Sequence, residues 1–191
     1  GWFSWPLTLL WIVGITNAVN LSDGLDGLAG GICAIACGAV AVFAASTSNL
    51  AVVVLMLALL GSVTGFLFFN FNPAKIFMGD CGSMFLGFTI ASASVLCFIK
   101  SSALVGLALP VAVLGVPVFD TLFSMLRRFL ERRSIFSADR SHFHHRLVDL
   151  GLTQRQAVIA IYGLTLLAAG LGMLMIVAPG IHVLIIFFCI L

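Results

Sequence analysis

Two apolar runs decide the fold of this chain: LAGGICAIACGAVAVFAAS at residues 28–46 and LAVVVLMLALLGSVTGFLFF at residues 50–69. Neither run contains a charged side chain. A helix needs about 20 predominantly apolar residues to cross the hydrocarbon core of a bilayer. The two runs therefore predict a pair of membrane-spanning helices.

The composition extends this prediction to the whole chain. Hydrophobic residues make up 62% and charged residues 8% of the 191 residues, and the mean hydropathy is +1.23. A water-soluble domain carries about 25% charged residues, so this class is excluded. Small residues at four-residue spacing, as in Gly30, Ala34 and Gly38, let helices pack closely in lipid. The expected further segments are 2–16, 84–99, 103–126, 157–178 and 181–191.

We therefore predict one integral-membrane domain over 1–191, an all-α polytopic helix bundle of about seven segments. The chain starts at Gly1 within an apolar run and stops at Leu191 within another. We accordingly expect it to be the C-terminal portion of a longer chain.

The charges predict the orientation. If the segments alternate across the membrane, the loops 17–27, 70–83 and 127–156 share one side, which receives eight of the nine Lys and Arg residues. The positive-inside rule makes that side cytoplasmic. All seven Asp and Glu residues map to the same side or to helix ends that touch it. This concentration of both signs indicates a polar active face in addition to a topology signal.

The loop 17–27 reads NAVNLSDGLDG. Gly24 and Gly27 weaken a helix here, so a broken or tightened helix end is expected. A polar helix end with Asp and Asn caps is the simpler alternative. Four oxygen-bearing side chains recur at intervals of three residues: Asn17, Asn20, Asp23 and Asp26.

The loop 70–83 reads NFNPAKIFMGDCGS. The Asn72-Pro73 step is expected to end the preceding helix. Asp80 stands between two glycines, and the next helix is expected to begin at Gly82 and Ser83, where free N–H groups could bind a phosphate. Phe77 could stack on a base or anchor the chain at the membrane interface. A helix cap is the simpler role for Asp80.

Together the two loops predict a magnesium site. Mg²⁺ is bound through one or two carboxylates together with substrate phosphates and water. Asn20 or Asp23 from the first loop and Asp80 from the second would be the protein ligands, and a diphosphate would complete the coordination. Mn²⁺ is an alternative ion.

The third loop, 127–156, holds seven arginines and three histidines, including the sequence HFHHR at 142–146. Arginine suits bidentate phosphate binding, and His144, His145 and Arg146 form a compact donor cluster. The other arginines have a simpler explanation in topology and lipid headgroup contact. A zinc site is a weaker alternative because Cys and Glu partners are lacking.

Four motifs in this order resemble the polyprenyl-phosphate N-acetylhexosamine-1-phosphate transferases. The form of the last motif resembles the branch that starts O-antigen, enterobacterial common antigen and teichoic-acid linkage units, rather than the peptidoglycan translocase branch. The motifs are NAVNLSDGLDGLA at 17–29, FNPAKIFMGDCGS at 71–83, PVFD at 117–120 and DRSHFHHRL at 139–147.

This resemblance implies that a membrane polyprenyl phosphate, undecaprenyl phosphate in bacteria, attacks the β-phosphate of a UDP-N-acetylhexosamine. The products are a polyprenyl diphosphate sugar and UMP, and Mg²⁺ neutralises the diphosphate. The setting is the cytoplasmic face of a bacterial inner membrane. The roles implied for the residues are metal binding by Asn20 and Asp80, catalysis by Asp23, Asp26 and Asp80, and substrate binding by Asn17, Phe77, His144, His145 and Arg146.

The family also carries an aspartate pair on an earlier cytoplasmic loop, and 1–191 contains no Asp-Asp pair. We therefore expect this portion alone to be inactive. The other functions left open are the peptidoglycan-type phospho-MurNAc-pentapeptide transferase and a non-enzymatic transporter or lipid-binding bundle. GlcNAc is the favoured sugar although the residues do not select it, no nucleic-acid partner is expected, and a homodimer remains open.

Overall fold

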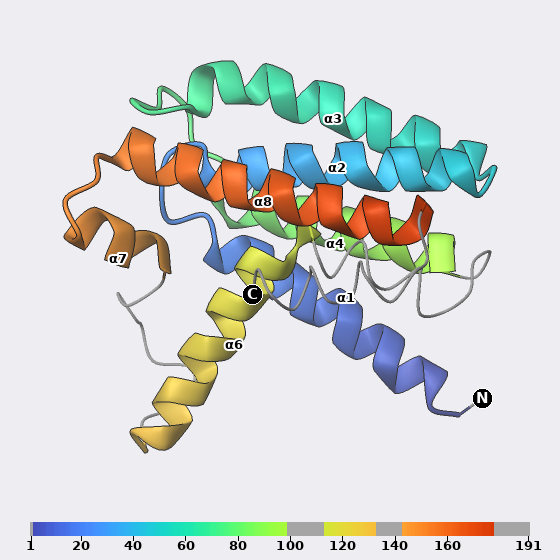
Figure 1. Ribbon diagram of the computed structural model, residues 1–191, viewed down its shortest axis with the longest axis horizontal. Helices are drawn as coiled ribbons and strands as arrows, with labels where there is room; N and C mark the ends of the chain where they lie inside the picture. Colours follow the sequence, from blue (N-terminus) through green and yellow to red (C-terminus); the bar gives the residue numbers. More distant parts are fainter. Residues whose placement is uncertain (1, 99–112, 133–142, 178–191) are drawn as a thin grey trace.

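The computed structural model describes residues 2–98, 113–132 and 143–177, and these residues contain helices and no strand (Figure 1). This confirms the all-α bundle. The helices of the described residues, in chain order, are α1 Ser4–Leu21, α2 Leu28–Ser46, α3 Leu50–Asn70, α4 Gly79–Phe98, α6 Gly115–Leu130, α7 Phe143–Asp149 and α8 Gln154–Val177.

Helix α2 lies at the centre of the bundle and packs against α3, α4 and α8 (Figure 1). Its Gly, Ala and Cys residues leave room for close neighbours. A Cβ added to Gly31 would lie only 1.9 Å from Cζ of Tyr162 on α8, whereas one added to Gly38 would meet nothing within 4 Å. Gly31, which is outside the spacing of small residues that the sequence singled out, therefore leaves room for the Tyr162 side chain of α8.

Four helices of the described residues are long and apolar enough to cross a membrane: α2, α3, α4 over Gly79–Cys97, and α8 over Gln154–Leu174. The protein is thus a multi-pass membrane protein. The expected segments 28–46 and 50–69 are confirmed within one residue. The segment 2–16 corresponds to α1, but α1 continues to Leu21, so residues 17–21 of the expected loop 17–27 are helical. Of the segment 103–126, only the part from 113 onwards is described, and 181–191 lies outside the described residues. The number of about seven segments stays a prediction.

Helix α4 corrects one expected boundary. It begins at Gly79, five residues before the expected segment 84–99, so the polar residues of the GDCGS motif form its first turn. Gly79 has φ +66°, a conformation that glycine adopts without strain. Asp80 in the first turn is favoured by the positive end of the helix dipole. The motif is helical because its polar residues suit a helix N-terminus.

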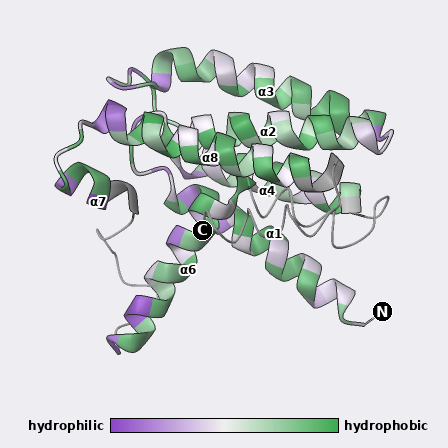
Figure 2. Cartoon of the chain, viewed as in Figure 1, coloured by the Kyte–Doolittle hydropathy of each residue, from purple (hydrophilic) through white to green (hydrophobic). Residues whose placement is uncertain are grey.

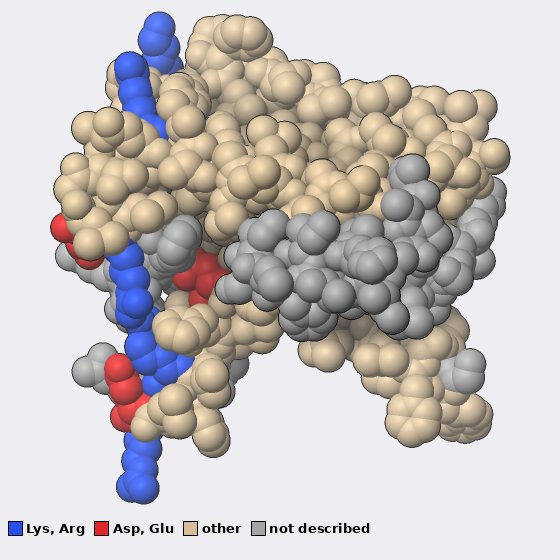
Figure 3. All heavy atoms as spheres, viewed as in Figure 1, with Lys and Arg blue, Asp and Glu red and all other residues tan. Residues whose placement is uncertain are grey.

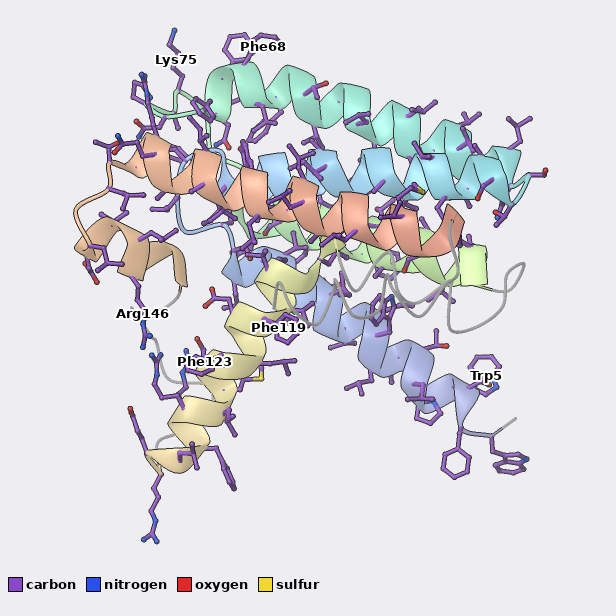
Figure 4. All side chains as sticks on the ribbon, in the orientation of Figure 1. Trp5, Phe68, Lys75, Phe119, Phe123 and Arg146 are labelled. Atoms are coloured by element: carbon purple, nitrogen blue, oxygen red, sulfur yellow. The ribbon has the colours of Figure 1, made fainter. Side chains whose placement is uncertain are left out.

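Polar and charged residues gather at one end of the described part. Hydrophilic residues lie mainly at the left of the view, around α7, the first turn of α8 and the loops beside them (Figure 2). On the face shown in Figure 3, the Lys, Arg, Asp and Glu side chains also lie at the left. Trp5, near the start of α1, lies at the opposite end (Figure 4). The described residues of the loops 17–27, 70–83 and 127–156 thus share one end of the bundle (Figure 1).

Candidate functional site

The site is built where α1 ends beside the beginning of α4, two helices that pack along much of their length. Nε1 of Trp11 donates to Oγ of Ser94 at 2.9 Å, inside the apolar part of the pair. Closer to the site, a Cβ added to Gly87 would lie 2.8 Å from Cα of Thr16. The backbones therefore approach closely there. These two contacts set the distance between the polar ends of the two helices.

At those polar ends, Asn20 meets two residues of α4. Its Nδ2 donates to Oδ1 of Asp80 at 3.1 Å and to Oγ of Ser83 at 2.9 Å. The hydroxyl of Ser83 donates to the carbonyl oxygen of Gly79 at 3.1 Å, so Ser83 presents a lone pair to Asn20. Since both partners of Asn20 are acceptors, the NH₂ group faces them. Oδ1 of Asn20 and Oδ2 of Asp80 take no part in these bonds and can serve a ligand.

Asp23 adds a second carboxylate. It follows the end of α1 at Leu21 and is half-buried. Burial raises the pKa of the Asp23 carboxyl above its usual value, and the charge of Asp80 raises it further. The two carboxylates repel each other in this partly buried site. A cation bound between them would be favoured, because it attracts both negative charges.

The beginning of α4 supplies N–H groups beside these oxygens. The first four N–H groups of a helix have no partner within it, and in α4 they belong to residues 79–82. Ser83 is the fifth residue of the helix, so the expectation that its N–H is free is wrong. Ser83 contributes its side chain instead, buried against Asn20.

Among the other predicted site residues, the described side chains of Asn17, Phe77 and Arg146 make no hydrogen bond to this pair. Asn17 is exposed and donates from Nδ2 to the carbonyl oxygen of Val13 on its own helix, at 2.8 Å. Phe77 is 77% exposed in the loop before α4. Arg146 is exposed on α7, and Figure 4 shows its side chain pointing away from α8. His144 and His145 lie in α7, but their side chains are outside the described residues.

Asp26 is bonded to the loop between α3 and α4. Its Oδ2 accepts from Nδ2 of Asn72 at 3.0 Å and from the main-chain N–H of Ala74 at 3.1 Å. Asp23 and Asp26 are three residues apart, yet their environments differ. The charge of Asp80 acts on Asp23, whereas Asp26 bonds to the loop between α3 and α4.

Sequence reasoning missed several residues that organise this end of the molecule. The amides of Asn70 and Asn72 stand out as polar groups at the end of an apolar run, and this signal could have found them. No sequence signal distinguishes Gln154, Arg155 or Tyr162. Their side-chain bonds are to Asn72 and to the main chain of Gly27.

Within 2–98, 113–132 and 143–177, no group of three or more His, Cys, Asp or Glu side chains is arranged to hold a metal ion. The polar side chains at the Asn20–Asp80 pair carry the oxygen atoms of one amide and of two carboxylates, those of Asp80 and Asp23. This is a small, hard-oxygen set open to solvent on one side.

Comparison with known proteins identifies the family of this chain. Residues 1–98, which contain all of α1–α4, match the family described as Glycosyl transferase family 4. The chain belongs to glycosyl transferase family 4.

Individual relatives extend the match beyond residue 98. A protein of Bacillus subtilis (strain 168), named probable undecaprenyl-phosphate N-acetylglucosaminyl 1-phosphate transferase, is 51% identical over 162 residues, covering 85% of this chain and 45% of that protein. A decaprenyl-phosphate N-acetylglucosaminephosphotransferase of Mycobacterium leprae (strain TN) is 40% identical over 175 residues, covering 82% of this chain and 44% of that protein. A phospho-N-acetylmuramoyl-pentapeptide-transferase of Halalkalibacterium halodurans is 39% identical over 175 residues, covering 90% and 51%. The chain spans about half the length of these relatives.

Proposed function

We propose that this chain is part of an enzyme that transfers N-acetylglucosamine 1-phosphate from a UDP-sugar to undecaprenyl phosphate in the bacterial plasma membrane, releasing UMP. Such a transfer would initiate a cell-envelope polysaccharide. The observation that carries the proposal is the bonding of Asn20 to Asp80 beside the half-buried Asp23. The 51% identity to the Bacillus subtilis relative supports the choice of lipid and sugar.

The residues at this site fit Mg²⁺. This ion keeps several water ligands and uses one or two carboxylates together with substrate phosphates, rather than a closed protein cage. Asp80 through Oδ2, Asn20 through Oδ1 and the carboxylate of Asp23 would hold it. When bound, the ion would neutralise the diphosphate and the leaving UMP. Mn²⁺ satisfies the same ligands.

The chain's own residues would bind and orient the diphosphate. The N–H groups at the start of α4 can donate to a phosphate oxygen. Asp80 is in the same turn, so a Mg²⁺ ion held by its carboxylate would lie next to these N–H groups. In the transfer, an oxygen of the lipid phosphate forms a bond to the β-phosphorus of the UDP-sugar. The bond from that phosphorus to the oxygen bridging the two phosphates breaks, and UMP leaves with that oxygen. In-line positioning and charge stabilisation are the main demands of such a step.

The remaining predicted residues would bind the UDP-sugar. Phe77 is 77% exposed in the loop that leads into α4, so its ring is accessible for stacking on uracil. Arg146 is exposed on α7 beside His144 and His145 in sequence, and it can donate to phosphate or sugar oxygens. Asn17 is exposed on the last turns of α1. Gathering of charged residues at one end of the bundle supports a cytoplasmic location of this site (Figure 3).

A phospho-MurNAc-pentapeptide transferase is the second candidate. The observation in its favour is the 39% identity to the Halalkalibacterium halodurans relative of that name. The two candidates share the acceptor lipid and differ in the sugar donor, so a donor comparison separates them.

The test is UMP release by the complete natural protein in detergent, with undecaprenyl phosphate and either UDP-GlcNAc or UDP-MurNAc-pentapeptide. We expect Mg²⁺-dependent release with UDP-GlcNAc. Asp80→Asn should lower kcat by about a thousandfold or more, since it removes a metal ligand. Full activity of Asp80→Asn would exclude the metal assignment, and release from the pentapeptide donor alone would favour the second candidate.

A further inference from the structure

The loop between α3 and α4, residues 71–78, is bonded on two sides to segments far away in the sequence. One is the turn between α1 and α2, which contributes Asp26. The other is the first turn of α8, which contributes Gln154 and Arg155. These residues do not belong to the Asn20–Asp80 pair, so their bonds call for a separate explanation.

Asn72 is the common partner of all three. Its Nδ2 donates to Oδ2 of Asp26 at 3.0 Å and to Oε1 of Gln154 at 2.8 Å. Its main-chain carbonyl oxygen accepts from Nε of Arg155 at 2.7 Å. We name Asp26, Asn72, Gln154 and Arg155 the Asn72 junction.

A second set of bonds holds the same loop at its base. The side chain of Asn70 is buried, with 3% of the residue exposed. Its Oδ1 accepts from the main-chain N–H of Gly27 at 3.1 Å, and its Nδ2 donates to the carbonyl oxygen of Ile76 at 2.9 Å. The hydroxyl of Tyr162 on α8 donates to the carbonyl oxygen of Gly27. Two separate sets of hydrogen bonds, those of Asn72 and those of Asn70 and Tyr162, therefore connect the α1–α2 turn, the loop 71–78 and α8.

The junction connects the two segments that would bind the UDP-sugar. The loop 71–78 contains Phe77 and leads directly into Asp80. Helix α7, which contains His144, His145 and Arg146, packs against α8 and precedes it in the chain. The bonds of Gln154 and Arg155 to Asn72 thus attach the first turn of α8, which follows α7 in the chain, to the loop that contains Phe77.

We propose that the Asn72 junction positions the UDP-sugar site, and that Asp26 acts in it as a hydrogen-bond acceptor for the loop 71–78, not as an acid, a base or a metal ligand. This inference rests on the proposed function. It assigns Asp23 and Asp26, which the sequence treats alike, to different tasks. Asp26 is then a positioning residue that acts through Asn72 and Ala74.

The contacts of Asp26 allow an experiment to distinguish its role as a hydrogen-bond acceptor from a role of its negative charge. Both bonds end on the single atom Oδ2. An asparagine at position 26 can present its carbonyl oxygen to the same two donors without any charge. An alanine cannot, and it leaves the N–H of Ala74 and the amide of Asn72 short of an acceptor, which is costly in a partly buried site.

The experiment compares Asp26→Asn with Asp26→Ala in the complete natural protein, measuring UMP release against UDP-GlcNAc concentration. Asp26→Asn should keep KM within about threefold of the wild type, whereas Asp26→Ala should raise KM by about tenfold with a much smaller change in kcat. Arg155→Ala should raise KM in the same direction. Displaced binding groups weaken ground-state binding, which is why KM is the affected constant.

Gln156→Ala is the matched control. Gln156 lies in the same first turn of α8, but its side chain accepts from the N–H and hydroxyl of Thr153, at 2.9 and 3.0 Å, and so stabilises the helix end only. It should leave KM unchanged. Amide hydrogen exchange at Ala74 gives a readout independent of activity: it should accelerate in Asp26→Ala and Arg155→Ala but not in Asp26→Asn or Gln156→Ala.

The outcomes separate the two proposals. Equal losses of kcat in Asp26→Asn and Asp26→Ala would show that the charge of Asp26 is needed and would overturn the inference. A lower maximal rate of Asp26→Ala at unchanged KM would indicate only a smaller folded fraction and would overturn it as well. A wild-type protein without UMP release would contradict the proposed function, while exchange at Ala74 would still decide whether the junction holds the loop.

Discussion

The amide of Asn20 bonds directly to the carboxylate of Asp80, with 3.1 Å between Nδ2 and Oδ1, although the two residues are 60 positions apart. The bond joins the last turn of α1 to the first turn of α4. Oδ2 of Asp80 takes no part in this bond. The geometry of the candidate cation site therefore depends on a neutral residue as much as on the acids.

Replacing Asn20 tests this dependence. Asn20→Ala removes both the donor that holds Asp80 and the Oδ1 ligand, so the affinity for Mg²⁺ should fall about 10- to 100-fold. The measurement is the Mg²⁺ concentration that gives half-maximal UMP release. Asn49→Ala is the control, because Asn49 precedes α3 and makes no side-chain cap bond. An unchanged Mg²⁺ requirement in Asn20→Ala would remove Asn20 from the site.

Gly87 should control the distance between the same two helices. A Cβ at this position would lie 2.8 Å from Cα of Thr16, so Gly87→Ala must separate α1 from α4. We expect a loss of about 1–3 kcal/mol in stability from overpacking and a lower kcat, because the Asn20–Asp80 bond is stretched.

Gly14→Ala is the matched control for this substitution. Gly14 lies on α1, and a Cβ there would meet nothing within 4 Å. The variant should be neutral or stabilised by up to about 1 kcal/mol, the difference in helix propensity between alanine and glycine. Thermal unfolding in detergent measures both effects. Equal behaviour of the two variants would contradict a close contact at Gly87.

Phe77 should affect substrate binding selectively. If its exposed ring stacks on uracil, Phe77→Ala should raise KM for the UDP-sugar by about 10- to 100-fold, since stacking on a base contributes about 1–3 kcal/mol. Phe77→Tyr keeps the ring and should stay close to the wild type. Phe68→Ala is the control, because Phe68 is 87% exposed on α3 and points outwards in Figure 4. An unchanged KM in Phe77→Ala would leave membrane anchoring as the role of this ring.

Asp23 should make the metal-free protein sensitive to pH. Burial and then the charge of Asp80 raise the pKa of its carboxyl in the folded state. The folded state thus binds this proton more tightly than the unfolded chain. The resulting stability is fully present below the usual pKa of Asp, about 3.9, and is lost as the pH rises through the raised pKa.

Asp23→Asn abolishes this titration and supplies the comparison. In EDTA, the unfolding temperature of the wild type should fall relative to that of Asp23→Asn as the pH rises from about 4 towards neutrality. Mg²⁺ should raise the wild-type unfolding temperature at neutral pH more than that of the variant. Parallel pH curves for the two proteins would contradict a raised pKa at Asp23.

Much of the fold followed from local pattern. The runs 28–46 and 50–69 are helices within one residue of their expected limits, because length and hydropathy alone decide whether a segment can span a bilayer. The expected helix end near Gly24 and Gly27 is also confirmed: α1 ends at Leu21, and Gly27 has φ +81°. The beginning of α4 was placed too late because the apolar run starts only after the polar residues GDCGS, whereas these residues form the first turn of the helix.

The sequence alone determined that this is a helical membrane protein with most of its charges and its acidic motifs at one end. Those properties depend on composition, on the length of apolar runs and on short motifs, which are local. Only the tertiary structure decided that Asp23 lies close enough to Asp80 for their charges to interact, while Asp26 bonds to the loop of Asn72. Two aspartates of the same spacing diverge because the chain leaves the helix between Leu21 and Gly27, and because their partners come from α4 and from the loop before it. Such pairing is set by which helices pack together, and no local pattern contains that information.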